Sequence, residues 1–264
     1  MTTENRVYVN VKTEHIIASG LSDRGLVREE NEDSIFLDES GQVLLLADGM
    51  GGHERGAEAS QTAVKVFKEH LTPEKIKEEL RDITAAAGVS PEIACLYTII
   101  FRAVGKTAEY LAKRNDELML KRYMGTTIVG LFLAKDGNVL WFHIGDSRLY
   151  LWRDSALKRL TADHSLYSEW VKAGRIGPEP NKNIITRVMG IDRFVDADID
   201  WDKRVTNDLF LLCSDGLTDM ITDAQIEEVL NSEVDVDIIA NRLLDKALEA
   251  GGKDNTSVIV CRVV

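Results

Sequence analysis

The chain has 264 residues, of which 44% are hydrophobic and 29% charged, and its formal net charge is −12 at pH 7. This length can bury a full core, and the balance of residue types is that of a globular protein rather than of a disordered or fibrous one. The excess of acidic groups argues against direct electrostatic binding of nucleic acid or of an anionic membrane.

The predicted elements follow one another without a linker, repeat or low-complexity tract. We therefore expect an N-terminal arm over residues 1–14 and one domain over residues 15–264. The first apolar runs predict strands at 15–19, 34–37 and 42–47. Apolar residues three or four positions apart then predict two helices. One starts near Glu54, and the other has Ser90 as N-cap and Pro91 as its first residue.

The second half begins with apolar runs that predict strands at 127–133, 139–144, 148–152 and 208–213. The segment 134–138 carries an Asp-Gly signal for a tight hairpin between the first two. Thr222 and Gln225 form a capping-box pattern that begins one helix, and Gly251 ends another before a last strand at 256–263. Hairpin-linked strands and segregated helices predict an α+β fold, with antiparallel sheets packed inside helices.

The cysteines Cys95, Cys213 and Cys261 are odd in number and form no CxxC pair, which argues against a zinc knuckle or a disulfide framework. Their apolar neighbours predict buried free thiols in a reducing compartment. The first twelve residues are polar, unlike a signal peptide, and no segment approaches the length of a membrane span. We expect a cytoplasmic protein without a membrane or nucleic-acid partner.

Acidic residues stand where the predicted strands begin or end. For any single one, a simple turn is the better interpretation, because Asp and Gly are common turn residues. Several such ends brought together would crowd carboxylates that cannot all stay ionised without cations, and sequence spacing leaves that convergence open. The residues are Asp48-Gly49, Gly145-Asp146, Asp215-Gly216, Asp254 and Glu32-Asp33.

Oxygen ligands without clustered His or Cys favour Mg²⁺ or Mn²⁺ over Zn²⁺. The glycine-rich segment 48–53 fits neither a dinucleotide fingerprint nor a P-loop. Its glycines would instead let the backbone approach an ion, with the carbonyl of Gly49 as a candidate ligand. The sequence thus predicts a magnesium or manganese site.

Eight motifs in order make the chain resemble the metal-dependent protein phosphatases of the 2C type, in particular their bacterial branch. The resemblance runs from about Ile17 to the C-terminus. It implies a four-layer α-β-β-α sandwich, in which helix pairs flank a central antiparallel β-sandwich, and a flap at about 165–194 beside the active site. The motifs are 25–33, 48–52, 125–127, 145–148, 160–165, 186–190, 213–217 and 254–257.

The resemblance implies a centre of two Mn²⁺ or Mg²⁺ ions, with a possible third. Asp48 would bridge both core ions, and the carbonyl of Gly49 would help to bind one of them. Asp215 and Asp254 would complete the other. Asp146, together with Asp215, would bind the weaker third ion.

Three more residues receive roles from the resemblance. Glu32 and Asp33 would hold metal-bound waters or act as secondary ligands. Arg28 would grip the substrate phosphate with its planar guanidinium. Without the motif, a surface ion pair of Arg28 with a nearby glutamate is the plainer interpretation.

The implied reaction is hydrolysis of phosphoserine and phosphothreonine by a metal-bridging hydroxide, without a covalent phospho-enzyme. Cys213 is then a core residue and not a nucleophile. The acid that protonates the leaving group stays unassigned, because Met50 stands where eukaryotic members often carry a histidine. We expect His53 to be a solvated loop residue, and His164 to organise a loop rather than to do chemistry.

The expected partners of this monomer are phosphorylated proteins, among them a bacterial Ser/Thr kinase and its substrates. The flap is expected to influence substrate choice. Trp170 and Ile176 there belong to a minor core or to a docking patch, and the minor core is the preferred interpretation. A stress or sporulation phosphatase is an alternative, although such enzymes usually carry sensor or membrane domains for which this chain has no room. A catalytically dead phosphoprotein-binding module is another, although it should have lost metal ligands.

Overall fold

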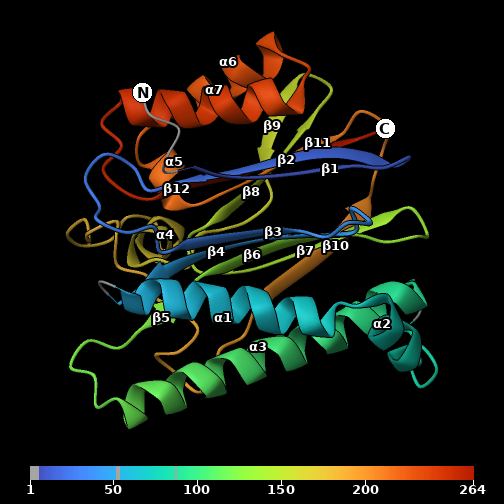
Figure 1. Cartoon of the computed structure of the whole chain (residues 1–264), viewed down its shortest axis with the longest axis horizontal. Coiled ribbons are helices and arrows are strands. Elements are labelled where there is room, and N and C mark those ends of the chain that lie inside the picture. The colour runs from blue at the N-terminus through green and yellow to red at the C-terminus, as the bar shows by residue number, and fades with distance from the viewer. Residues whose placement is uncertain (1–5, 52–53, 87) are drawn as a thin grey trace.

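Two antiparallel β-sheets lie face to face, and helices cover the outer face of each (Figure 1). The computed structural model describes residues 6–51, 54–86 and 88–264. In Figure 1 one sheet and its helices form the upper half of the molecule, and the other sheet and its helices form the lower half. This arrangement confirms the expected α+β fold with four α-β-β-α layers.

The upper sheet has the strand order β1-β2-β12-β11-β8-β9. The central strands β11 and β12 are apolar and almost wholly buried, because the lower sheet covers one of their faces and helices cover the other. The strands of this sheet are β1 (Arg6–Lys12), β2 (Ile16–Asp23), β8 (Arg148–Arg153), β9 (Ala156–Arg159), β11 (Leu209–Cys213) and β12 (Thr256–Val263).

The lower sheet has the order β10-β7-β6-β4-β3, and the short strand β5 pairs with the end of β4. A tight hairpin joins β6 to β7. The Ala134 amide donates to the Asn138 carbonyl (3.0 Å), and Gly137 has a φ of +86°, so the predicted hairpin is confirmed. The strands are β3 (Asp33–Leu37), β4 (Val43–Met50), β5 (Gly125–Thr126), β6 (Ile128–Leu133), β7 (Asn138–Ile144) and β10 (Asp198–Lys203).

Two helices begin at the caps that the sequence predicts. The Ser90 hydroxyl accepts from the Ile93 amide (3.2 Å), and Thr222 and Gln225 make both bonds of a capping box. Gly251 directly follows the C-cap of the last helix with a φ of +130°. The helices are α1 (Glu54–His70), α2 (Pro73–Glu79), α3 (Pro91–Glu117), α4 (Leu166–Lys172), α5 (Asp215–Thr218), α6 (Asp223–Ser232) and α7 (Val236–Glu249).

Apolar side chains fill three layers, one between the sheets and one between each sheet and its helices. Cys95, Cys213 and Cys261 lie in different layers as buried free thiols, which confirms that prediction. Burial raises the pKa of Cys213 to about 12. This thiol is therefore protonated at neutral pH, and it is no nucleophile.

Four strands and three helices lie where the sequence predicts none. The strand β5 has only two residues, β1, β9 and β10 are edge strands, and β1 falls within the N-terminal arm. The strands β9 and β10 keep polar side chains because less of an edge strand is covered. In β1, by contrast, Val7, Val9 and Val11 form an alternating strand pattern that the expectation of an arm overlooks. The helices α2, α4 and α5 have seven, seven and four residues, too few for a helical period to stand out.

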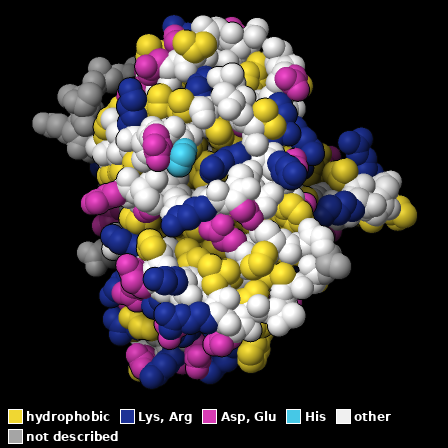
Figure 2. All heavy atoms as spheres, turned by 90° about the vertical axis from the view of Figure 1, so that its right-hand side faces the viewer, with side chains coloured by type: hydrophobic (Ala, Val, Ile, Leu, Met, Phe, Trp, Pro, Cys, Tyr) yellow, Lys and Arg dark blue, Asp and Glu magenta, His cyan; other side chains and the backbone are white. Residues whose placement is uncertain are grey.

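Figure 2 shows the end of the molecule that lies to the right in Figure 1. Basic and acidic side chains are interspersed over this face, between hydrophobic ones. The net charge of −12 is therefore not gathered there into one acidic surface. In the part of the chain that the structure describes, no helix is both long and apolar enough to cross a membrane.

Candidate metal centre

Strand ends from both sheets meet at the end of the sandwich that lies to the left in Figure 1. Asp33 begins β3 and pairs in register with Asp48 near the end of β4. The Asp33 carboxylate also accepts hydrogen bonds from Ser214 (2.9 Å) and Ser257 (2.6 Å). Ser214 directly follows β11 and Ser257 lies in β12, so the Asp33 carboxylate links the lower sheet to the upper sheet.

Five carboxylates gather at this joint. Asp215 is close enough to Asp48 for its charge to raise the pKa of Asp48. The structure thus brings together the acidic strand ends whose convergence the sequence leaves open. The groups whose charges act on Asp48 are Asp33, Asp215, Asp146 and Asp254.

Burial raises the pKa of these carboxyl groups, and their mutual repulsion raises it further. The pKa rises from an ordinary value of 3.8 to about 7 for Asp33 and Asp146, and to about 6 for Asp215. The pKa of Asp48 rises for the same two reasons. Groups so close together cannot all be ionised unless cations offset their charge.

Two carboxylate oxygens at the joint have no partner among the described residues. They are Oδ1 of Asp33 and Oδ1 of Asp146, and both are buried. An unpaired buried polar atom costs about 1–3 kcal/mol, and such atoms are rare in native proteins. Because hard divalent cations prefer carboxylate and carbonyl oxygens, the residues at this joint fit Mg²⁺ or Mn²⁺.

Gly49 lies against the first turn of α1. A Cβ atom at Gly49 would come within 2.0 Å of the carbonyl oxygen of Gly56, so this approach requires glycine. The Gly56 amide donates to Oε1 of Glu32 (3.0 Å), and burial raises the pKa of Glu32. His53 lies outside the described residues, so its expected place in a solvated loop stays a prediction.

Arg28 reaches into the carboxylate cluster. Its Nη2 donates to Oδ2 of Asp254 (2.6 Å), and both side chains are partly exposed. Partial burial disfavours its charge, but Asp254, with smaller effects of Glu32 and Asp48, raises its pKa overall. Among the ion pairs of the described residues, its partner is Asp254 and not one of the glutamates beside it in sequence.

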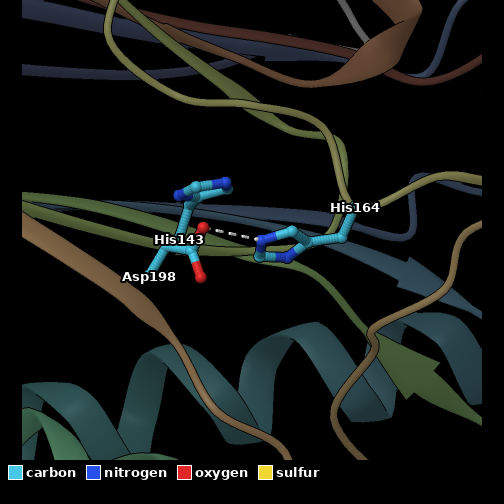
Figure 3. A group of neighbouring side chains, drawn as sticks. All are labelled: His143, His164 and Asp198. Atoms are coloured by element: carbon cyan, nitrogen blue, oxygen red, sulfur yellow. Dashed lines mark ion pairs between the residues drawn. The ribbon is translucent and has the colours of Figure 1, made fainter. Parts of the chain in front are cut away.

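A buried histidine holds the turn that carries Asp146. The backbone amide of Gly145 donates to Nδ1 of His164 (3.1 Å), so the ring proton sits on Nε2, where it donates to Oδ2 of Asp198 (3.2 Å). Figure 3 shows this contact, with the ring of His143 close by and stacked at 4.5 Å. Burial lowers the pKa of His164 to about 4, so the ring is neutral at pH 7.

The trio His143, His164 and Asp198 offers ligand atoms within 4.8 Å of one another. A cation already lies beside it, because Nη1 of Arg187 is 2.7 Å from Asp198 and 3.3 Å from Nε2 of His164. Since Nδ1 of His164 is also occupied by a backbone amide, the trio is better explained as support for the Gly145 turn. This agrees with the expected structural role of His164.

Replacing His164 by Ala is expected to lower the free energy of unfolding by roughly 1–3 kcal/mol. The change leaves the buried Gly145 amide without its partner, whereas the half-exposed Asp198 keeps its ion pair with Arg187. Urea denaturation followed by tryptophan fluorescence measures this loss. His15→Ala, at an exposed histidine, is the control and should change stability by less than about 0.5 kcal/mol. Equal effects of the two changes would rule out the supporting role.

A cavity of about 660 Å³ extends from the carboxylates to the flap. Asp146, Asp215 and Asp254 line one part of it, and Tyr167 and Lys182 of the flap line another. The flap is thus placed where it can contact a substrate. The expectation of Ile176 in a minor core is wrong, because this side chain is 80% exposed. Trp170 is partly buried and donates to the carbonyl of Gly177 (3.2 Å).

The sequence does not single out the residues that orient the acidic groups. Ser214 and Ser257 hold Asp33, and Oδ1 of the buried Asn255 accepts from the amide of Glu32 (2.9 Å). Their signal is weak, since serine and asparagine beside a strand usually mean a turn. Their place within the motifs at 213–217 and 254–257 is the one feature of the sequence that points to them.

The chain is similar to known protein phosphatases along most of its length. A family model described as "Protein phosphatase 2C" matches residues 26–249. The serine/threonine phosphatase stp of Listeria welshimeri is 35% identical over 247 residues, which are 90% of this chain and 92% of the relative. The serine/threonine protein phosphatase PstP of Mycobacterium tuberculosis is 36% identical over 249 residues, which are 92% of this chain and 44% of the relative.

Solved structures agree with these sequence matches. The catalytic domain of the phosphatase PstP in complex with two manganese ions has a TM-score of 0.78 and 34% identity, and the match covers 95% of this chain and 99% of that one. The serine/threonine phosphatase Stp1 from Staphylococcus aureus has a TM-score of 0.79 and 28% identity, and the match covers 98% of each chain.

Proposed function

The chain belongs to the protein phosphatase 2C family, and on this premise we propose that its carboxylate cluster is the metal-dependent active site of a bacterial serine/threonine protein phosphatase. The enzyme is a phosphoprotein phosphatase, a hydrolase of phosphate monoesters. The observation that carries the proposal is the cluster of buried carboxylates with raised pKa values. These groups repel one another, and bound cations would allow all of them to be ionised at the same time.

We assign the metal-binding roles as follows. Asp48 would bridge two core ions, with the Gly49 carbonyl on one of them and Asp215 and Asp254 on the other. The unpaired oxygen of Asp146 supports a third ion beside Asp215. The unpaired oxygen of Asp33 supports a secondary role for it, and Glu32 would act in the same way. When bound, the ions would make water acidic enough to supply a nucleophile and would offset charge on the phosphoryl oxygens.

Arg28 would bind the substrate phosphate. Its guanidinium is partly exposed at the edge of the cluster, and a fork of N–H groups suits two phosphoryl oxygens. In the proposed complex, the Arg28 guanidinium would leave the Asp254 carboxylate and bind the phosphate, so that Asp254 could bind an ion. Met50 follows Gly49 and has a thioether without an exchangeable proton, so this position supplies no acid to the leaving group.

The identity of the metal ions and of the substrate is proposed from the oxygen ligands at the site and from the similar proteins. Oxygen donors suit both Mn²⁺ and Mg²⁺, and a similar catalytic domain binds two manganese ions. We propose that the enzyme is a cytoplasmic monomer that acts on phosphorylated proteins, and that it opposes a Ser/Thr kinase. A catalytically dead module is disfavoured, because the candidate ligands are present and lie together.

Metal removal tests the proposed function. After dialysis against a chelator, hydrolysis of 4-nitrophenyl phosphate and of a phosphothreonine peptide should fall by at least about a hundredfold, since no nucleophile forms at neutral pH without the ions. Added Mn²⁺ or Mg²⁺ should restore both activities, whereas Na⁺ at the same ionic strength serves as the control. Turnover that persists in the chelator would contradict the proposal.

A further inference from the structure

A second cavity opens beside the strand that carries Asp48. Its volume is about 290 Å³, and Met50 and Gly51 form one side of it. Met50 ends β4, two residues after Asp48. Because a strand rises about 3.3 Å per residue, the Cα atoms of these two residues are about 7 Å apart. The cavity therefore lies beside the strand end that carries Asp48, and it shares no lining residue with the larger cavity.

The walls of this cavity are fixed by a buried side chain of α3. Asn115 accepts from the Met124 amide (2.9 Å) and donates to the carbonyls of Met124 and Gly190 (2.8 Å each). These bonds hold the segments that present Tyr123 and Ile191 to the cavity. Gly51 packs against the backbone of Met124, since a Cβ atom there would lie 3.0 Å from the Met124 Cα. The cavity is thus built into the fold.

The lining of the cavity is basic and apolar. Lys121 and Arg122 are exposed, and neither takes part in an ion pair with another described residue. Tyr123 and Ile191 are about half exposed, at 46% and 48%. The volume suits one side chain and not a folded partner. Two cations above an apolar wall match a carboxylate at the end of a short aliphatic stem.

Resting on the function proposed above, we propose that this cavity binds an acidic side chain of the phosphoprotein, about two residues from the phosphoserine or phosphothreonine. We call it the acidic-residue pocket; its lining is Met50, Gly51, Lys121, Arg122, Tyr123 and Ile191. The pocket begins at Met50, two residues along β4 from Asp48, and this span of about 7 Å matches two residues of an extended peptide. Because the net charge of the chain is −12, the two cations of the pocket offset the repulsion that an acidic segment of a phosphoprotein would otherwise meet there.

Two phosphothreonine peptides test the pocket. They differ only at the positions two and three residues on each side of the phosphothreonine, which are Glu in one and Ala in the other. The metal-loaded wild-type enzyme should show a kcat/KM about tenfold higher for the Glu peptide, and added salt should reduce this preference. The double variant Lys121→Glu, Arg122→Glu should lose or reverse it.

The control is Lys75→Glu, Lys77→Glu, which makes the same change of charge on exposed positions of α2, at the opposite end of the molecule (Figure 1). It should keep the wild-type preference. Melting curves establish that both double variants are folded, which the exposure of all four side chains favours.

The outcomes separate the two proposals. Equal kcat/KM of the wild type for both peptides, or equal losses in the variant and in the control, would overturn the pocket and leave the phosphatase function standing. A preference for Ala over Glu at the flanking positions would overturn the acidic occupant. Turnover of 4-nitrophenyl phosphate with no turnover of either peptide would overturn the protein phosphatase function, and the pocket with it.

Discussion

The variant Asp48→Asn is expected to lose about a thousandfold in kcat/KM with saturating Mn²⁺, or about 4 kcal/mol of transition-state stabilisation. Its metal-free form should nevertheless be more stable than the wild type. Asp48 is surrounded by the charges of four other carboxylates, and the amide of Asn keeps the shape of the side chain while removing its charge. The variant therefore relieves repulsion that only bound cations would otherwise offset.

Two measurements check these opposite effects on activity and on stability. Steady-state hydrolysis of 4-nitrophenyl phosphate gives the loss of activity, and thermal melting in a chelator at pH 7.5 gives the gain in stability. Asp82→Asn is the matched control, because it makes the same chemical change at an exposed position. It should alter neither quantity. A metal-free Asp48→Asn protein that melts below the wild type would show that the carboxylate is stabilised by the protein itself, and would count against a metal-binding role.

The sequence predicts the buried parts of this fold well. The strands β11 and β12 are covered on both faces, and such strands must be unbroken apolar runs, which are easy to recognise. The helix caps at Ser90 and Thr222 are hydrogen bonds between residues three positions apart, so they too can be predicted from residues that are close in sequence. Both features depend on short-range chemistry alone.

Other features depend on tertiary contacts. β1 joins the sheet through backbone pairing with β2, and its alternating valines are a strand signal, but the partner strand cannot be predicted from them. Ile176 is apolar by composition but is exposed on the flap, where no layer covers it. The meeting of Asp33 and Asp215, 182 positions apart, follows from the packing of two sheets. The family resemblance supplied these site residues, because no periodicity or spacing could have placed them together.

The metal-free protein is expected to lose stability as the pH rises from about 4 to about 8. The pKa values of Asp33, Asp146 and Asp215 are about 7, 7 and 6 in the folded protein, against 3.8 for the ordinary group. Between these values the folded state binds more protons than the unfolded state, so raising the pH favours unfolding. The contribution of these three groups to the free energy of unfolding is fully present below about pH 4. It is lost as the groups ionise in the folded protein near pH 6–7.

Saturating Mn²⁺ should reverse this trend, because ions bind the ionised carboxylates and bind them more strongly as protons leave. Thermal melts between pH 5 and pH 8, in chelator and in Mn²⁺, therefore diverge as the pH rises. Asp48→Asn in chelator should show a shallower slope than the wild type, since one of the repelling charges is gone. Parallel curves with and without Mn²⁺ would mean that the carboxylates and the ions do not share a site. The same repulsion that makes the empty cluster costly is thus what makes it select for divalent cations.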